Sequence, residues 1–484
     1  MTKDLVKGKF KNKKLTRVSR IIFILLFILS IIFFGIILLL QIVPIKYLLP
    51  VICIYFDCML IGGICQCKKS VGSNIKCFFN VISCICIIMV CIGIFYIYKT
   101  MNFMDIIGFN GYEIENYYVV TLRGAYDSIR DINRGSLGEY SNSMNYIDAL
   151  NKLDQKIDFK KEIYADFEEA STALLNGSID AIFMNQSHKD MADEQISGFI
   201  DSVEILDTIS IKVKSGVVIK DVDVTKEPFN IYISGIDIYG DISSISRSDV
   251  NMIVTVNPNT SQVLLTSIPR DYYVRLHGTS GYKDKLTHAG LYGIDMSITT
   301  LEDLLDIDIN YYIRVNFTTL ISMVDSIGGI DIYSDTSFTA HTNHSCTYEM
   351  GMNHLNGSCA LAFSRERYAY KEGDRHRVEN QQAVITAILN KILSSKTLVT
   401  KYTGILHSLE GSFQTNMPQK KIYSLVNMQL DKMPSWDINN YSLNGRDSRN
   451  YTYSYSNSTL YVMEPDYTTV VKGKKLIDIL MEGE

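Results

Sequence analysis

Arginine and aspartate side chains recur at a few points in the second half of the chain, where they could bind a phosphorylated substrate. Arg247 and Asp249 stand together in RSD, and Arg270 follows a proline that ends the apolar run QVLLTSI. A denser group lies between positions 365 and 377 and comprises Arg365, Arg367, Lys371, Arg375 and Arg377. A guanidinium presents its donors as a fork that matches phosphate oxygens, so this pattern predicts an anion site.

Carboxylates accompany these arginines. Asp237 follows the apolar run FNIYISGI, and Asp249 comes directly before the run VNMIVTV. Carboxylate oxygens suit a hard divalent cation such as Mg²⁺, while arginines neutralise the remaining phosphate oxygens. The combination predicts a diphosphate bound through Mg²⁺ and a phosphoryl transfer, which depends on positioning and charge neutralisation more than on covalent chemistry.

Each of these residues also has a simpler explanation, since charged side chains at loops often cap turns or pair with one another in solvent. Two details favour a site. Arg365 and Arg367 alternate about Glu366 after the apolar run CALAF, so an extended segment would point both arginines to one side. Arg377 and Gln381 fall on the apolar face expected for the next helix, where polar side chains need partners.

The elements that must position these residues alternate between strand and helix. The runs FNIYISGIDIYG and YYIRVNF predict strands, and VNMIVTV and QVLLTSI predict two more, joined at the turn NPNT. Helices are expected over Lys285–Leu305, in TTLISMVDSI and after Arg377. Pro269 cannot donate to a sheet, so Arg270 should lie just past a strand end, with Asp271 as its orienting partner or a loop cap. The pattern predicts an α/β domain around a central sheet over residues 228–470, followed by a C-terminal tail over 471–484.

A second, smaller α/β domain is expected over residues 112–224. Strand-like runs such as NYYVVTL and VEILDTISIKV flank a helix, turn and strand in DFEEASTALLNGSIDAIFMN. No catalytic or metal-binding arrangement is apparent there, and the acids of DFEEA are expected on a solvated helix face. The domain is therefore interpreted as an accessory unit.

Three apolar segments precede both domains and are expected to cross a membrane within residues 21–98. Ile21–Val43 and Cys77–Tyr98 are long enough to span, whereas Ile45–Cys65 is weaker because it contains Pro50 and Asp57. Asp57 is expected to make a polar contact between helices or to lie at the interface. The basic tail 1–20 and the lysines before Cys77 place the N-terminus in the cytoplasm and everything after about Lys99 outside. In the alternative, the middle segment is re-entrant and both domains are cytoplasmic.

Charge and cysteine content limit the function further. The formal net charge is -5, and no helix-turn-helix or basic stripe is apparent, which argues against nucleic acid as a partner. Of the ten cysteines, only Cys346 and Cys359 lie outside the first hundred residues. They could form a disulfide in an oxidising exterior or stay as free thiols.

The charged motifs resemble those of the LytR-CpsA-Psr family of envelope phosphotransferases. The matching stretches run in order over about 228–395: ISGID, RSD, SIPRDYYV, KDKLTHAGLYG, FTTLISMVDSIGGIDI, HLNGSCALAFSRER and GDRHRVENQQ. The membrane segments and the extra domain are similar to the capsule-type branch. Two positions depart from the family pattern, Thr287 and Asn380, and neither belongs to the proposed site.

The resemblance implies an α/β/α sandwich with a central mixed sheet and an apolar pocket for a polyprenyl chain. The implied activity moves a glycopolymer from an undecaprenyl-diphosphate carrier onto peptidoglycan with Mg²⁺, at the outer side of the cell membrane. By matching position, the metal-associated acids are Asp237 and Asp249. The implied catalytic residues are Asp237, Asp249, Arg270, Arg365 and Arg367. The implied diphosphate-binding residues are Arg247, Arg270, Lys285, Arg365, Arg367, Arg377 and Gln381.

Two other functions remain open. The same scaffold could hydrolyse lipid diphosphates with water as the acceptor. A polymer-binding sensor or scaffold without enzymatic activity would also retain the anion site, although its cytoplasmic part would comprise only the tail 1–20. The polymer and the general base stay open, because the arginines would recognise only the diphosphate–lipid part of a donor.

Overall fold

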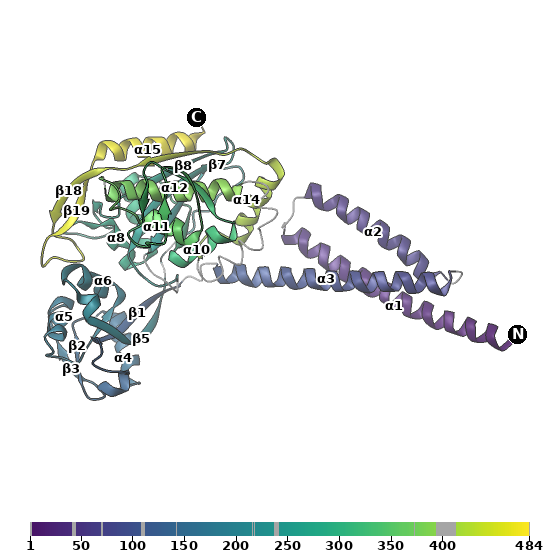
Figure 1. Ribbon diagram of the computed structural model, residues 1–484, viewed down its shortest axis with the longest axis horizontal. Coiled ribbons are helices and arrows are strands. Elements are labelled where there is room, and N and C mark those ends of the chain that lie inside the picture. The colour runs from purple at the N-terminus through teal and green to yellow at the C-terminus, as the bar shows by residue number, and fades with distance from the viewer. Residues whose placement is uncertain are drawn as a thin grey trace.

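The computed structural model describes residues 2–40, 45–68, 71–107, 112–141, 143–214, 216, 218–236, 242–371, 373–393 and 413–483. Figure 1 shows three parts: a group of long helices, a small domain in blue-teal and a larger domain from teal to yellow. The C-terminal helix lies across the larger domain, and the N-terminus lies at the far end of the long helices.

The long helices correspond to the apolar segments. They are α1 (Thr2–Leu40), α2 (Ile45–Cys67) and α3 (Ser73–Ile107). Each contains a stretch long and apolar enough to cross a membrane, namely Leu15–Leu39, Ile45–Cys67 and Ser73–Tyr98. Polar groups join the helices, since Lys76 Nζ donates to Thr16 Oγ1 at 2.6 Å and Gln66 Nε2 donates to Ser83 Oγ at 2.8 Å. Asp57 is exposed on α2, and its expected contact between helices or placement at the interface stays a prediction.

The accessory domain contains a five-stranded sheet with the order β3-β2-β4-β1-β5. Its strands are β1 (Tyr112–Leu122), β2 (Ser136–Glu139), β3 (Lys160–Ile163), β4 (Ala181–Asn185) and β5 (Val203–Lys214). Its helices are α4 (Met144–Asp154), α5 (Phe167–Leu175), α6 (Gln186–Gln195), α7 (Phe199–Ser202) and the 3₁₀ turn η1 (Ile129–Ile132). The strand β1 is antiparallel to both of its neighbours, whereas β2 is parallel to both of its own. In the stretch DFEEA, Asp166 is the N-cap of α5 and accepts from the amides of Glu168 and Glu169.

The larger domain is built on a six-stranded mixed sheet with the order β16-β11-β6-β7-β8-β17. These strands are β6 (Phe229–Ile236), β7 (Ser248–Asn257), β8 (Gln262–Ile268), β11 (Tyr311–Val315), β16 (Phe413–Thr415) and β17 (Asp437–Ser442). The pairs β6–β11 and β8–β17 are parallel, and the other pairs are antiparallel. Short pairs complete the domain: β9 (Tyr273–Val274) with β10 (Asp284–Lys285), β12 (Ile330–Ser334) with β15 (Gly351–Leu355), β13 (Phe338–Thr339) with β14 (Thr347–Tyr348), and β18 (Gly445–Asn450) with β19 (Leu460–Pro465).

Helices cover both faces of this sheet because successive strand residues alternate between the faces. Tyr232 and Ile253 pack toward α9 (Ile294–Leu305) and α15 (Tyr467–Glu482). Ile231 and Val254 pack on the other side, toward α12 (Asp374–Leu393) and α14 (Gln419–Lys432). Next to α12 lie α10 (Phe317–Ser326) and α11 (Gly357–Arg365). The expected α/β/α sandwich with a central mixed sheet is confirmed.

Two boundaries differ from the sequence prediction. The helix expected over Lys285–Leu305 is divided into α8 (Leu286–Ala289), the 3₁₀ turn η2 (Gly290–Tyr292) and α9, because Gly293 has φ 105°, a conformation that favours glycine. Residues 471–483, expected as a tail, instead lie mostly in α15, and Ile477 and Leu480 are buried in the core. The larger domain therefore continues almost to the end of the described chain.

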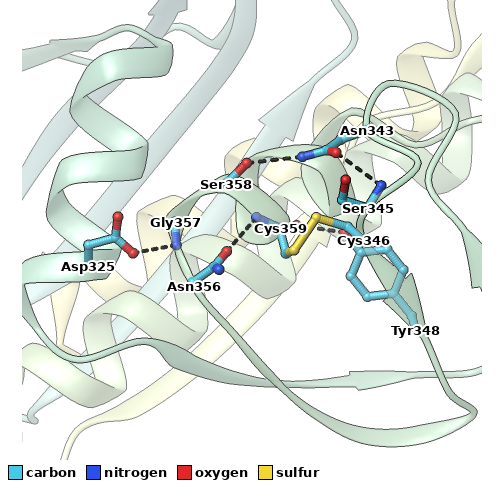
Figure 2. Close-up of a disulfide and its surroundings, with 9 residues drawn as sticks. All are labelled: Asp325, Asn343, Ser345, Cys346, Tyr348, Asn356, Gly357, Ser358 and Cys359. Carbon is cyan, nitrogen blue, oxygen red and sulfur yellow. Dashed lines mark hydrogen bonds between the residues drawn. A yellow bond between two sulfur atoms is a disulfide. The ribbon is translucent and has the colours of Figure 1, made fainter.

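A disulfide joins Cys346 to Cys359, which settles the alternative between a bond and two free thiols (Figure 2). Cys359 lies in the first turn of α11, and its amide donates to the N-cap Asn356. Tyr348 supports the bond from the other side, because its hydroxyl donates to the carbonyl oxygen of Cys359 at 2.7 Å. The disulfide thus fixes the loop between β13 and β14 to the start of α11.

Candidate active site

A cavity of about 380 Å³ lies between the sheet and the helices α10, α11 and α12. Apolar side chains form much of its wall: Ile233, Ile236, Val250, Val315, Phe317, Leu320, Leu361, Val384 and Ile385. The charged residues that line it are Asp249, Arg270, Arg365, Arg367 and Arg377, and the lining also includes Gln381. Six of the residues proposed from the sequence therefore lie around one cavity, with an apolar wall beside four arginines.

Arg270 and Asp249 form the ion pair at the sheet side of this cavity. Arg270 Nη1 donates to Asp249 Oδ2 at 3.0 Å, and Arg270 Nε donates to Asp271 Oδ2 at 3.3 Å. The position of Arg270 follows from the end of β8, where its carbonyl accepts from the amide of Thr287 at 2.8 Å. Asp271 is thus the orienting partner that the sequence suggested.

Asp249 is held as an anion in this arrangement. Burial by itself would raise the pKa of its carboxyl group, but Arg270, Arg247 and Arg377 together lower that pKa below its ordinary value. Thr287 contributes to the same effect by donating to Asp249 Oδ1 at 3.2 Å. The cavity therefore combines one ionised carboxylate with an excess of positive charge.

The arginines of α11 and the following loop reach the cavity by a geometry that differs from the sequence prediction. Arg365 is the last residue of α11 rather than part of an extended segment, and Glu366 alone has an extended backbone between the two arginines. The guanidinium of Arg365 lies over the ring of Phe317, 4.3 Å from its centre, and that of Arg367 lies over Tyr368. Both arginines line the cavity nonetheless.

Glu366 is a structural residue that the sequence reasoning overlooked. Its side chain is buried and accepts hydrogen bonds from the amides of His341, Arg367, Tyr368 and Ala369. Burial would raise the pKa of Glu366, but these four amides lower it below its ordinary value. A glutamate between two arginines looks like an ordinary surface ion pair, so nothing in the residue types indicated this role.

Arg377 and Gln381 lie one turn apart on α12 and face the cavity, as the periodicity of this helix predicted. Other lining residues were not singled out from the sequence: Asn316, His341, Thr342, Ser364 and Tyr368. Asn316 carries a recognisable signal, because it is the N-cap of α10 and accepts from the amide of Thr319 at 2.9 Å. That signal identifies a helix start and not a cavity residue.

Two further described residues of the predicted set, Lys285 and Arg247, lie outside the lining. Lys285 is buried beside the cavity, with its Nζ 3.7 Å from Asp271 Oδ1. Arg247 lies close enough to Asp249 to lower its pKa, and its Nε also lies 3.8 Å from Asp190 Oδ2 of the accessory domain. Asp237 lies outside the described residues, so its predicted role as a metal ligand stays a prediction.

These features define an α/β/α protein with a partly apolar, arginine-lined cavity, suited to an anion that carries an apolar chain. The chain belongs to the LytR_cpsA_psr family, whose model matches residues 194–469. The resemblance inferred from the motifs is thereby confirmed. The matched region begins inside the accessory domain, before β5, and ends in α15.

Named relatives match a smaller part. The polyisoprenyl-teichoic acid–peptidoglycan teichoic acid transferase TagU of Bacillus cereus (strain AH820) is 37% identical over 200 residues, which cover 41% of this chain and 64% of that protein. Biofilm regulatory protein A of Streptococcus mutans is 36% identical over 213 residues, which cover 41% of this chain and 52% of that protein. The matches thus span less than two thirds of either relative. Among solved structures, TagV of B. subtilis has a TM-score of 0.46 at 29% identity and covers 53% of this chain and 98% of that one.

Proposed function

We propose that this protein is a membrane-anchored phosphotransferase that moves a glycopolymer from an undecaprenyl-diphosphate carrier onto peptidoglycan. The observation that carries the proposal is the cavity in which Arg270, Arg365, Arg367 and Arg377 stand beside an apolar wall. The arginines would bind the diphosphate, and the apolar wall would take the first part of the polyprenyl chain. Family membership and the names of the relatives support the same reaction.

Asp249 is suited to a second task, the binding of Mg²⁺. Its pKa is held low, so the carboxylate is ionised at neutral pH, and Mg²⁺ is typically bound through one or two carboxylates together with substrate phosphates. No group of three metal-binding side chains occurs among the described residues, which is compatible with an ion held largely by the diphosphate. We propose Asp249 and Asp237 as its protein ligands, and the bound ion would neutralise charge on the transferred phosphoryl group.

The proposed location is the outer face of the cell membrane, with three spans and a cytoplasmic N-terminus. The start of α2 supports this topology, since Lys46 Nζ lies 2.7 Å from Asp431 Oδ1 on α14 of the larger domain. The start of α2 therefore lies on the same side as that domain. The last span leads into the accessory domain on that side as well.

The identity of the polymer is a finer proposal. The accessory domain suggests the capsule-type branch, whereas the relatives named above include teichoic acid transferases. Both classes of polymer share the polyprenyl-diphosphate part of the donor, which is the part that the cavity would bind. We therefore propose a lipid-linked anionic glycan as the class of donor. Within that class, the prediction from the sequence is a capsular polymer.

The test uses the full-length protein in detergent with a synthetic polyprenyl-diphosphate glycan, Mg²⁺ and peptidoglycan, and mass spectrometry of the recovered wall. Transfer that is lost in Arg270→Ala and kept in Arg275→Ala, an exposed position nearby, would support the proposal. Release of lipid monophosphate without attachment to peptidoglycan would favour a hydrolase. Tight binding without any turnover would favour a scaffold.

A further inference from the structure

The loop that leads into β7 is held by the accessory domain. In the backbone, the amide of Ile114 on β1 donates to the carbonyl of Ser243 at 2.9 Å, and the amide of Ile245 donates back to Ile114 at 2.8 Å. Asn116 Nδ2 adds a bond to Ser244 Oγ at 3.0 Å. Because Arg247 and Asp249 follow directly, the accessory domain fixes the approach to both of these residues.

The same domain also contacts the side chain of Arg247. Asp190 on α6 places its Oδ2 3.8 Å from Arg247 Nε, and both side chains are largely buried, with 13% and 18% of their surface exposed. The other carboxylate oxygen of Asp190 accepts from Gln186 Nε2 at 2.6 Å and lies 3.6 Å from Lys189 Nζ. Asp190 is thus held in place on its own helix while it faces a residue of the larger domain.

Charges of alternating sign continue from this contact into the cavity. Arg247 faces Asp190 and also lies near enough to Asp249 to act on it: burial raises the pKa of Asp190 although Arg247 opposes that rise, and Arg247 helps to lower the pKa of Asp249. Asp249 is in turn paired with Arg270 at 3.0 Å. A guanidinium between two carboxylates divides its attraction between them, so removal of one strengthens its pairing with the other.

Other contacts between the two domains fix the orientation in which Asp190 meets Arg247. Glu113 on β1 and Arg314 on β11 form an ion pair at 2.8 Å, with 3% and 1% of their side chains exposed. At a second point, the hydroxyl of Tyr455 donates to Glu168 at 2.7 Å. Buried and hydrogen-bonded contacts at separate places fix the orientation of α6 relative to β7.

We propose that Asp190 is a positioning residue of the active site, through which the accessory domain holds Arg247 away from Asp249. The inference rests on the proposed function, because it gives Arg247 and Arg270 a diphosphate to bind. With Asp190 in place, Asp249 keeps Arg270 as its partner. Without the Asp190 carboxylate, Arg247 pairs with Asp249 and competes with Arg270, so the donors that would meet the diphosphate are misplaced.

A double-mutant cycle in the full-length protein tests this role. The variants are Asp190→Asn, which retains an acceptor for Gln186, Arg247→Gln and the double variant. The measurements are kcat and KM for transfer, and calorimetric binding of farnesyl diphosphate. We expect Asp190→Asn to raise KM and weaken binding about tenfold, and to have no further effect once Arg247 is replaced. Asp190→Glu should restore most of the binding, and Asp193→Asn, exposed on the same helix, should behave as wild type.

Each outcome decides between alternatives. Equal losses from Asp190→Asn with and without Arg247 would overturn the inference, and so would wild-type binding in Asp190→Asn. A general folding defect would appear as a lowered Tm that Asp190→Glu does not restore, and it would also count against the inference. If the wild type binds farnesyl diphosphate but transfers no polymer, the proposed transferase activity is wrong. The binding measurements on the four proteins of the cycle then still test the role of Asp190. A wild type that binds no diphosphate would overturn both.

Discussion

Asp249 and Arg270 stand opposite each other across the open end of a hairpin. The antiparallel register of β7 and β8 pairs Asn257 with Gln262 next to the turn and Asn251 with Ile268 at the far end. Beyond the pair of Asn251 and Ile268, the same register continued by two residues on each strand places Asp249 opposite Arg270. Arg270 Nη1 lies 3.0 Å from Asp249 Oδ2. The pair therefore depends on the length of two strands and on the turn that joins them, and not on its immediate neighbours.

Replacement of Arg270 should abolish transfer. Arg270→Ala removes a donor to the proposed diphosphate and leaves Asp249 without its closest partner, and we expect a loss of about 10²–10³ in kcat/KM. Arg270→Lys should recover only a small part, because an ammonium cannot form the same two-sided contact with Asp249 and Asp271. Transfer assays at saturating and limiting donor measure both effects. Retention of wild-type transfer in Arg270→Ala would exclude Arg270 from the reaction.

The pH dependence of stability should reveal the ionised state of Asp249. Because its pKa in the folded state lies below the ordinary value of 3.8, its contribution to stability is present above that value and is lost as pH falls through the folded pKa. In Arg270→Ala, burial still raises this pKa while only Arg247, Arg377 and Thr287 lower it, so the folded pKa should rise toward the ordinary value and the loss of stability on acidification should become smaller. Urea unfolding between about pH 3 and pH 6 measures the shift, with Asp249→Asn as the control in which this step is absent. Identical curves for wild type and Arg270→Ala would contradict the assignment.

The disulfide should stabilise the loop that carries His341 and Thr342. The two cysteines are 13 positions apart, and closure of a loop of this size is worth about 2–3 kcal/mol. The paired variant Cys346→Ala/Cys359→Ala should lose about that free energy of unfolding and bind farnesyl diphosphate more weakly, since both loop residues line the cavity. Dithiothreitol should reproduce the effect in wild type and have none in the paired variant. Unchanged binding would separate the disulfide from the site.

The buried ion pair between the two domains should be sensitive to loss of one partner. Glu113→Gln leaves Arg314 as a buried charge without its counterion, and we expect a loss of about 3–5 kcal/mol. Replacement of both residues by Leu should cost much less. Fluorescence of Trp436, the single tryptophan of the chain, reports urea unfolding of the fragment 112–484. Equal losses from the single and the paired replacement would contradict this account.

The membrane topology can be measured with alkaline phosphatase fusions, because this enzyme is active only outside the cytoplasm. Fusions after Lys46 and after Tyr98 should be active, and a fusion after Lys68 should be inactive. A re-entrant α2 would instead leave the fusion after Tyr98 inactive and place both domains inside. The contact between Lys46 and Asp431 places the start of α2 on the same side as the larger domain, so the fusions after Lys46 and after Tyr98 should give the same result.

The sequence predicted those features that depend on local patterns. Turn residues and apolar runs indicated the hairpin of β7 and β8, and helical periodicity placed Arg377 and Gln381 toward the cavity. The membrane segments followed from length and composition. The fold class followed from the alternation of strands and helices, and it is confirmed.

Features that depend on contacts between distant segments were not predictable. Glu366 lies between two arginines in sequence, yet its partners include the amide of His341 on another loop. The role of Arg247 as a diphosphate ligand stays a prediction, and its contact with Asp190 joins two domains whose arrangement the sequence did not indicate. A single sequence gives the types of these residues and does not give the packing that brings them together.

The length of one connection limits where this protein can work. The last membrane helix ends at Ile107 and the accessory domain begins at Tyr112, and five residue steps extend to roughly 18 Å at most. The larger domain, which contains the arginine-lined cavity, is in turn fixed to the accessory domain by the contact of Glu113 with Arg314. The cavity is therefore kept close to the end of the last membrane helix. Under the proposed function, it would receive a lipid-linked donor that diffuses within the same membrane, and it would reach only wall strands near the membrane surface.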